Sequence, residues 1–263
     1  MSAITSKLNM SYCSFHKCRK TIHKQEKNKM KKVLLSLFTV CLFAMSLTAQ
    51  MTEGVVTMEV TEATSDDQQM AMQLGMLKGA TTTIYFTDKQ SLTSMDIMGG
   101  MMVSKSYSNA ANNTMDIMID AMGNKVWVSS PLDEAKKLQQ KEGVDNAEVT
   151  YHKEETKEIM GYKAHKVTVT MPETQAGMSI TGYVTDEIKT DATVINGAEG
   201  LNIDGFPLEF TVVTPQMTVT IAATDIKKEV DAAVFAPNTE GYQKMTMEQF
   251  TQSLGGMSGG LGF

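Results

Sequence analysis

The 263-residue chain contains few cysteines and almost no arginine, so it has few residues that could form a disulfide, act as a thiolate nucleophile or bind phosphate through a guanidinium. Its three cysteines (Cys13, Cys18 and Cys41) and its single arginine (Arg19) all lie within the first 49 residues. The rest of the chain can therefore form no disulfide and offers no thiol to a reaction. Because no guanidinium is left there to bind phosphates bidentately, nucleic acid is not expected as a partner.

Long apolar runs are also scarce, and the clearest one is short. It extends from Val33 to Met45, about 13 residues, whereas a membrane-spanning helix needs roughly 20. Lys31 and Lys32 precede this run, and a short segment ending in Ala49 follows it. A basic start, a short apolar centre and a small final residue are typical of a secretory signal peptide. We therefore predict export, cleavage before Gln50 and no integral membrane segment in the mature chain.

The signal peptide occupies residues 30–49, and residues 1–29 precede it. We interpret these 29 residues as an extension created by a start codon placed too early, with Met30 as the true initiator. Cys41 is not expected to carry a lipid, because it follows Val40, where such sites require a small residue, and the apolar run continues beyond it. The expected location is the periplasm or cell envelope of a Gram-negative bacterium, or the medium outside it.

Removal of residues 1–49 leaves an acidic chain. This segment holds nine of the 24 lysines and arginines but only one of the 30 aspartates and glutamates, so the mature chain has 15 basic and 29 acidic side chains. Its formal net charge is near −14. The remaining length suffices for a packed core, and we predict one domain over residues 50–250. The glycine-rich segment 251–263 has no periodicity and is expected to be a mobile tail.

Alternating apolar and polar residues, enriched in β-branched and aromatic types, predict a mainly β fold. Short links between the segments favour antiparallel pairing. The expected strands lie near 54–60, 81–87, 91–98, 102–108, 113–120, 124–129, 148–157, 162–171, 178–185, 207–213 and 216–227. Two helices are expected, from Ser65 to Lys78 with Ser65 as its cap, and from Pro131 to Lys141.

Methionine is abundant: 19 of the 23 methionines follow Ala49, and 12 of these lie between Met51 and Met122. Methionine is flexible and polarizable, and it suits both irregular cores and surfaces that accept varied ligands. Alternation puts several apolar residues of the expected strands on a common face, beneath the first helix. The candidate ligand-binding residues are Met58, Met95, Ile97, Met115 and Ile117 from the strands, with Met70, Leu74 and Leu77 from the helix.

Motifs for catalysis are missing. The chain has no Walker loop, dinucleotide fingerprint or Gly-x-Ser-x-Gly elbow, and only His152 and His165 remain after residue 49. We therefore expect no catalytic residues, no cofactor and no conventional metal site, and the chain is not expected to be an enzyme. A soft-metal site for Cu(I) or Ag(I), centred on Met98, Met101 and Met102, is a third interpretation of the methionines.

The second half contains four short motifs: Ile159–Lys166 (IMGYKAHK), Gly182–Ile188 (GYVTDEI), Gly205–Glu209 (GFPLE), and Val234–Pro237 (VFAP) with the following Gly241-Tyr242. Together they resemble the motifs of the secreted family called domain of unknown function 4412. The chain departs from the family where Gly182 replaces a usual Trp and Ala164 a frequent Cys. These motifs cover only residues 159–242.

The resemblance implies a strongly curved antiparallel sheet, an unclosed barrel with a few helices packed on its concave face, similar to the LolA/LolB type of lipoprotein carrier. It transfers no catalytic residues. The leading functional hypothesis is an exported binding or carrier protein for an apolar ligand such as a lipid or acyl chain. The alternative is a structural or stress-related envelope protein without a small ligand, and the soft-metal binder is the third.

Overall fold

The computed structural model describes residues 50–135, 147–171, 177–190 and 203–250. The expected signal peptide, the extension before it and the glycine-rich tail lie outside these residues. The helix expected at Pro131 to Lys141 is described only as far as Ala135, and residues 132–135 are helical.

Twelve strands form the described structure, and the mainly β prediction is confirmed. Eleven of the strands coincide, within a few residues, with the eleven that alternation predicts. The strands are β1 (Gly54–Thr64), β2 (Thr81–Phe86), β3 (Gln90–Ile97), β4 (Met102–Asn109), β5 (Thr114–Ala121), β6 (Asn124–Pro131), β7 (Glu148–Ile159), β8 (Tyr162–Thr170), β9 (Ser179–Thr185), β10 (Phe206–Val213), β11 (Thr218–Lys227) and β12 (Gln243–Met245).

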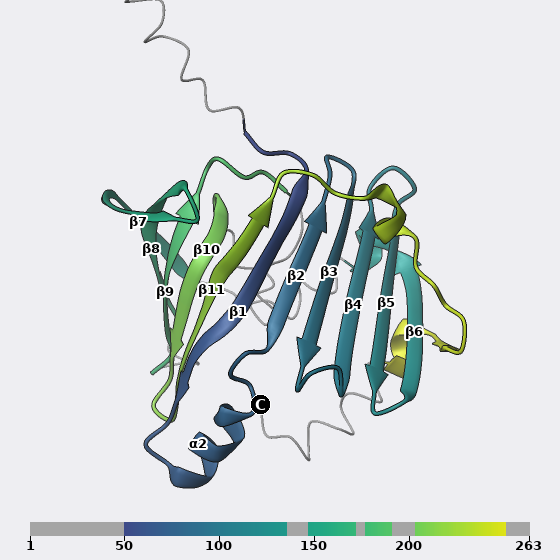
Figure 1. Cartoon of the computed structure of the whole chain (residues 1–263), viewed down its shortest axis with the longest axis horizontal. Coiled ribbons are helices and arrows are strands. Elements are labelled where there is room, and N and C mark those ends of the chain that lie inside the picture. The colour runs from purple at the N-terminus through teal and green to yellow at the C-terminus, as the bar shows by residue number, and fades with distance from the viewer. Residues whose placement is uncertain (1–49, 136–146, 172–176, 191–202, 251–263) are drawn as a thin grey trace, which may run out of the picture. The chain divides into compact units, whose positions relative to one another are not determined.

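All twelve strands belong to one curved, unclosed sheet in the order β12-β6-β5-β4-β3-β2-β1-β11-β10-β9-β8-β7 (Figure 1). Two antiparallel meanders, β1 to β6 and β7 to β11, are joined by the pairing of β1 with β11. The short strand β12 runs parallel to β6 and was not expected from the sequence. The sheet ends at β12 on one side and at β7 on the other.

Two faces of this sheet can be distinguished by cross-strand register, because directly paired residues point to the same side. Val56 pairs with Ile84, and Met58 pairs with Thr82, so these residues share what we call the inner face. Leu92 pairs with Tyr107 on the opposite, outer face.

The larger of two apolar clusters lies on the inner face of β1, β2, β10 and β11, and it also includes Ile159 of β7 and Ala164 of β8. Its buried members are Met51, Val56, Met58, Ile84, Phe86, Ile159, Ala164, Ile188, Phe206, Leu208, Phe210 and Ala223.

A second cluster lies on the outer face of β3 to β6, where the chain returns after β11. The 3-10 helix η2 (Ala232–Phe235) places Phe235 against Leu92, Tyr107 and Met118. Trp127 packs against the same cluster, and its Nε1 donates a hydrogen bond to Asp116 Oδ1 at 2.9 Å. Both faces of this half of the sheet therefore carry buried side chains.

The first helix, α2 (Gln68–Gly75), is shorter than expected, and the Ser65 cap is wrong. Asp67 caps the helix instead, since its Oδ1 accepts from Met70 N at 2.8 Å. The Ser65 hydroxyl is used elsewhere: it accepts from Asp67 N and donates to the Gln216 carbonyl. The helix lies at the end of β1 opposite Gly54 (Figure 1), and Leu74 is its buried residue.

Methionine occupies an unusual place in three of the hairpin turns. Four non-glycine residues among those described have positive φ, and three of them are Met98 (57°), Met122 (55°) and Met160 (53°). Each is followed directly by a glycine, also at positive φ. Asn or Asp is the usual choice at such turns, because a long side chain gains nothing from the left-handed conformation.

Candidate apolar ligand face

The inner face is concave, as the contact between two phenylalanines shows. Phe86 on β2 and Phe206 on β10 stack with ring centroids 6.4 Å apart. Strands β1 and β11 lie between them, so on a flat sheet their backbones would be about 14 Å apart, three strand spacings. Curvature toward this face brings the two rings together. Register shifts between β1 and β11, and between β9 and β10, are bulges of the kind that bend sheets.

The structure places all five strand residues of the expected ligand site on this inner face. Met58 and Met95 both pair with Thr82, one from each side. Met95 in turn pairs with Ser104, whose partner on β5 is Ile119, and alternation along β5 puts Met115 and Ile117 on the same side. Ile97 shares the side of Met95 on β3.

These side chains differ in exposure. Met58 is 1% exposed and Met115 8%, so both are packed as core. Met95, Ile97 and Ile117 are half-buried and present part of their surface. Of the three residues expected on the helix, Leu74 is buried and Met70 half-buried in α2, whereas Leu77 lies in the turn after α2 and is half-buried.

A stripe of small hydroxyl residues crosses the inner face of β3 and β4, and sequence reasoning missed it. We call it the hydroxyl stripe, and its members are Ser91, Thr93, Ser104, Ser106 and Ser108. The Ser91 and Ser108 hydroxyls lie 2.7 Å apart and hydrogen-bond to each other. Ser130 on β6 pairs with Met115 next to the stripe, and its Oγ is a buried side-chain oxygen without a hydrogen-bond partner. Polar groups thus stand among the apolar side chains.

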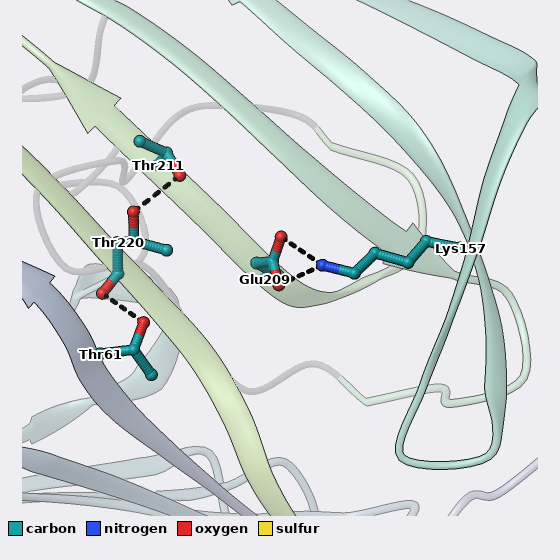
Figure 2. Close-up of polar contacts among 5 residues, drawn as sticks. All are labelled: Thr61, Lys157, Glu209, Thr211 and Thr220. Carbon is teal, nitrogen blue, oxygen red and sulfur yellow. Dashed lines mark hydrogen bonds and ion pairs between the residues drawn. The ribbon is translucent and has the colours of Figure 1, made fainter.

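The outer face of the other half of the sheet is polar. Thr211 and Thr220 join their hydroxyls at 3.0 Å, and Thr61 Oγ1 donates to the Thr220 carbonyl at 3.3 Å (Figure 2). Lys157 on β7 donates to both carboxylate oxygens of Glu209 on β10, at 2.9 and 2.7 Å. An exposed ion pair such as Lys157–Glu209 is screened by solvent and contributes little to the stability of the fold. The ligand hypothesis therefore concerns the inner face alone.

Among the described residues, the titratable groups with a shifted pKa lie away from the inner face of β3 to β5. The hydrogen bond from Lys166 holds the pKa of Glu155 below its usual value, and the same contact raises the pKa of Lys166 on the solvated side of β7 and β8. His152 hydrogen-bonds the Thr168 hydroxyl at 2.9 Å. Burial raises the pKa of Tyr107, which belongs to the outer cluster.

Within the described ranges, no three or more His, Cys, Asp and Glu side chains gather as metal ligands. The same part of the chain contains no helix with the length and apolarity needed to cross a bilayer.

Comparison with known proteins yields fold similarities only. No protein-family model matches the chain, and no curated protein matches it. Among solved structures, the chain is similar to the lipoprotein LppX of Mycobacterium tuberculosis (11% identity, 69% of this chain and 89% of that chain, TM-score 0.33). It is also similar to LprF of Mycobacterium bovis (16%, 73% and 90%, TM-score 0.28) and to a DUF1329 family protein of Desulfovibrio piger (10%, 74% and 93%, TM-score 0.32). Similarities of this size carry no argument about function, which has to come from the geometry.

Proposed function

We propose that this chain is an exported carrier or binding protein that holds a lipid or acyl chain against the inner face of β3 to β5. One observation carries the proposal: Met95, Ile97 and Ile117 lie half-buried on the inner face, next to the hydroxyl stripe. Apolar sites with a few polar groups are the usual form of small-molecule sites.

Side-chain size distinguishes the two halves of the inner face. On β1, β2 and β10, large side chains such as Met58, Phe86 and Leu208 pack together and are at most 1% exposed. On β3 and β4, the corresponding positions hold serine and threonine, whose short side chains reach less far from the sheet. A ligand bound over the stripe would supply the apolar contacts that these residues cannot, and its polar group could bond to their hydroxyls.

Filling the stripe with a large side chain tests the proposal. The change Ser106→Phe puts a ring between Thr93 and Ile117 on the inner face, and we expect it to weaken binding of a fluorescent fatty acid by at least about tenfold. The matched control is Ser94→Phe, because Ser94 pairs with Lys105 on the outer face of the same two strands. Its affinity should equal that of the unchanged protein. Equal affinities in folded Ser106→Phe and wild type, or no binding of any common acyl chain, would end the proposal.

A second candidate is an envelope protein without a small ligand. The 1% exposure of Met58 and the 8% exposure of Met115 favour it, because other protein side chains cover these two residues almost completely. In that case the methionines serve only as core.

Native mass spectrometry of protein purified from its own envelope separates the two candidates. A carrier should retain a co-purifying mass of lipid size, and the ligand-free candidate should not.

The same mass spectrum tests cleavage of the proposed signal peptide, which requires a polypeptide beginning at Gln50. The structure is compatible with that start, because Gln50 Nε2 donates to the Asp186 carbonyl and Met51 bridges Ile188, so both residues join the domain. A mass that includes Cys41 would contradict cleavage at Ala49.

A further inference from the structure

Two hairpin tips lie side by side at the α2 end of the sheet. The β3–β4 turn contains Met98, Gly99, Gly100 and Met101. The β5–β6 turn contains Met122, whose backbone N–H donates to the Met101 carbonyl at 2.9 Å. This bond continues the register in which Met102 faces Ala121, so Met101 and Met122 stand opposite one another.

Position in the turn separates these methionines from their neighbour Met102. Ile97 and Met102 form the last pair of the β3–β4 ladder, on the inner face, and Met98 and Met101 lie beyond it in the turn. Met122 lies in the adjacent turn, next to Met101, to whose carbonyl its backbone N–H is bonded. Directly opposed residues have Cβ atoms about 5 Å apart, a distance that flexible thioether side chains can close.

All three side chains are accessible, with exposed fractions of 41% for Met98, 50% for Met101 and 81% for Met122. Exposure of several large apolar residues at one tip is unfavourable for a soluble protein unless the residues have a use. Two of the three also hold the left-handed conformation that a side chain of this length rarely adopts.

Two carboxylates on the outer face hold the tips in place. Asp96 accepts from Gly100 N, and Asp120 accepts from Gly123 N at 3.0 Å. Both aspartates pair with Val103 from opposite sides, so their negative charges adjoin the methionines, and Lys125 offsets one of them at 3.6 Å from Asp120. A small cation at the tips would gain from this charge.

We propose that Met98, Met101 and Met122 form a thioether site for a single Cu(I) ion, independent of the proposed carrier function. Thioether sulfur is a soft, neutral ligand that selects Cu(I) and not hard divalent ions. The proposed site differs from the grouping expected from sequence, because Met122 from the neighbouring hairpin takes the place of Met102. Binding involves no electron transfer.

The test uses the full chain with Cys13, Cys18 and Cys41 changed to Ser, since thiolates would otherwise compete for the ion. Cu(I) affinity is measured by competition with bicinchoninate. Ag(I), which does not change oxidation state, serves as the probe for spectra of methyl-labelled methionine. We expect one ion per chain and shifts of three methyl signals, those of Met98, Met101 and Met122. Changing all three to Leu removes sulfur, keeps the side chains apolar and should weaken Cu(I) binding by at least about tenfold.

Matched controls come from the other exposed methionines. Met102→Leu alters a neighbour that lies outside the turn, on the inner face of β4, and Met160→Leu alters the same kind of turn, also exposed at 48%, at the other end of the sheet. Both variants should bind Cu(I) as the cysteine-free chain does. Absence of binding, equal shifts at Met160, or full affinity in the triple Leu variant would overturn the site. The fatty-acid result for Ser106→Phe bears on none of these outcomes.

Discussion

Replacing Phe86 with alanine is expected to remove about 3–5 kcal/mol from the free energy of unfolding, the range observed when a buried aromatic side chain is truncated. Phe86 is 0% exposed, and its ring stacks on Phe206 at an interplanar angle of 29°. Truncation leaves a cavity beside Phe206, at the contact between β2 and β10 across the curved sheet. Whole domains typically have a free energy of unfolding of only about 5–15 kcal/mol, so this substitution would remove a large fraction of the total stability.

Urea unfolding, followed by circular dichroism, measures this effect. The conservative change Phe86→Leu keeps most of the apolar volume and should cost clearly less. A double-mutant cycle with Phe206→Ala should show coupling, because the two rings share one contact. An Ala variant within about 1 kcal/mol of wild type would mean that the ring does not hold the curvature.

Replacing Gly54 with alanine should destabilise the protein by more than about 2 kcal/mol, well beyond an ordinary glycine-to-alanine change. Gly54 opens β1 with φ of +150°, and a Cβ there would overlap both Met51 Cε and the backbone carbonyl oxygen of Lys227 on β11. The methionine end could move aside. The carbonyl cannot move without shifting β11, so the start of the β1–β11 ladder must shift.

Gly75 provides the matched control. It ends α2, and a Cβ built there meets nothing within 4 Å. Gly75→Ala should therefore leave stability unchanged or raise it by up to about 1 kcal/mol. Thermal unfolding of both variants is the measurement. If Met51→Ala restored full stability to the Gly54→Ala chain, the clash with the Lys227 carbonyl would be ruled out as the cause.

The strands could be predicted because alternation is a local property of the sequence. The β-branched runs in β2 and β8 identify strands whatever their partners. Pairing of consecutive strands follows where the turns are short, such as Met122-Gly123 between β5 and β6. The pairing of β1 with β11 could not be predicted in this way, because the local sequence of a strand does not identify a partner that is distant along the chain. The three-residue strand β12 is too short for a periodic signal.

Assignment of faces was harder, and β4 shows why. Val103 and Tyr107 alternate there with Ser104, Ser106 and Ser108, a pattern that normally puts the serines in solvent. In the structure, Tyr107 packs under Phe235 on the outer face, and the serines take the inner one. Alternation identifies two sides but not which is concave, and here both sides are partly covered.

The common side of the candidate ligand residues on the strands could be predicted because period-two spacing fixes it. Spacing could not tell the 1% exposed Met58 from the half-buried Met95, since exposure depends on which strands curve over each residue. The grouping of Met101 with Met122 also depends on a contact between hairpins, which spacing along one hairpin does not contain.

The position of the first strand has a consequence for the order of folding. Thr57 and Thr224 are joined by a hydrogen bond across 167 residues, and the strands around them form the seam between the two meanders. Contacts of such separation form slowly, because loop closure has to precede them. Strands β2 to β6 can assemble as they emerge, but one edge of β1 stays unpaired until nearly the whole chain is available. A chain built this way remains incompletely folded until β11 has been made, which is the state that the proposed export through a narrow channel would require.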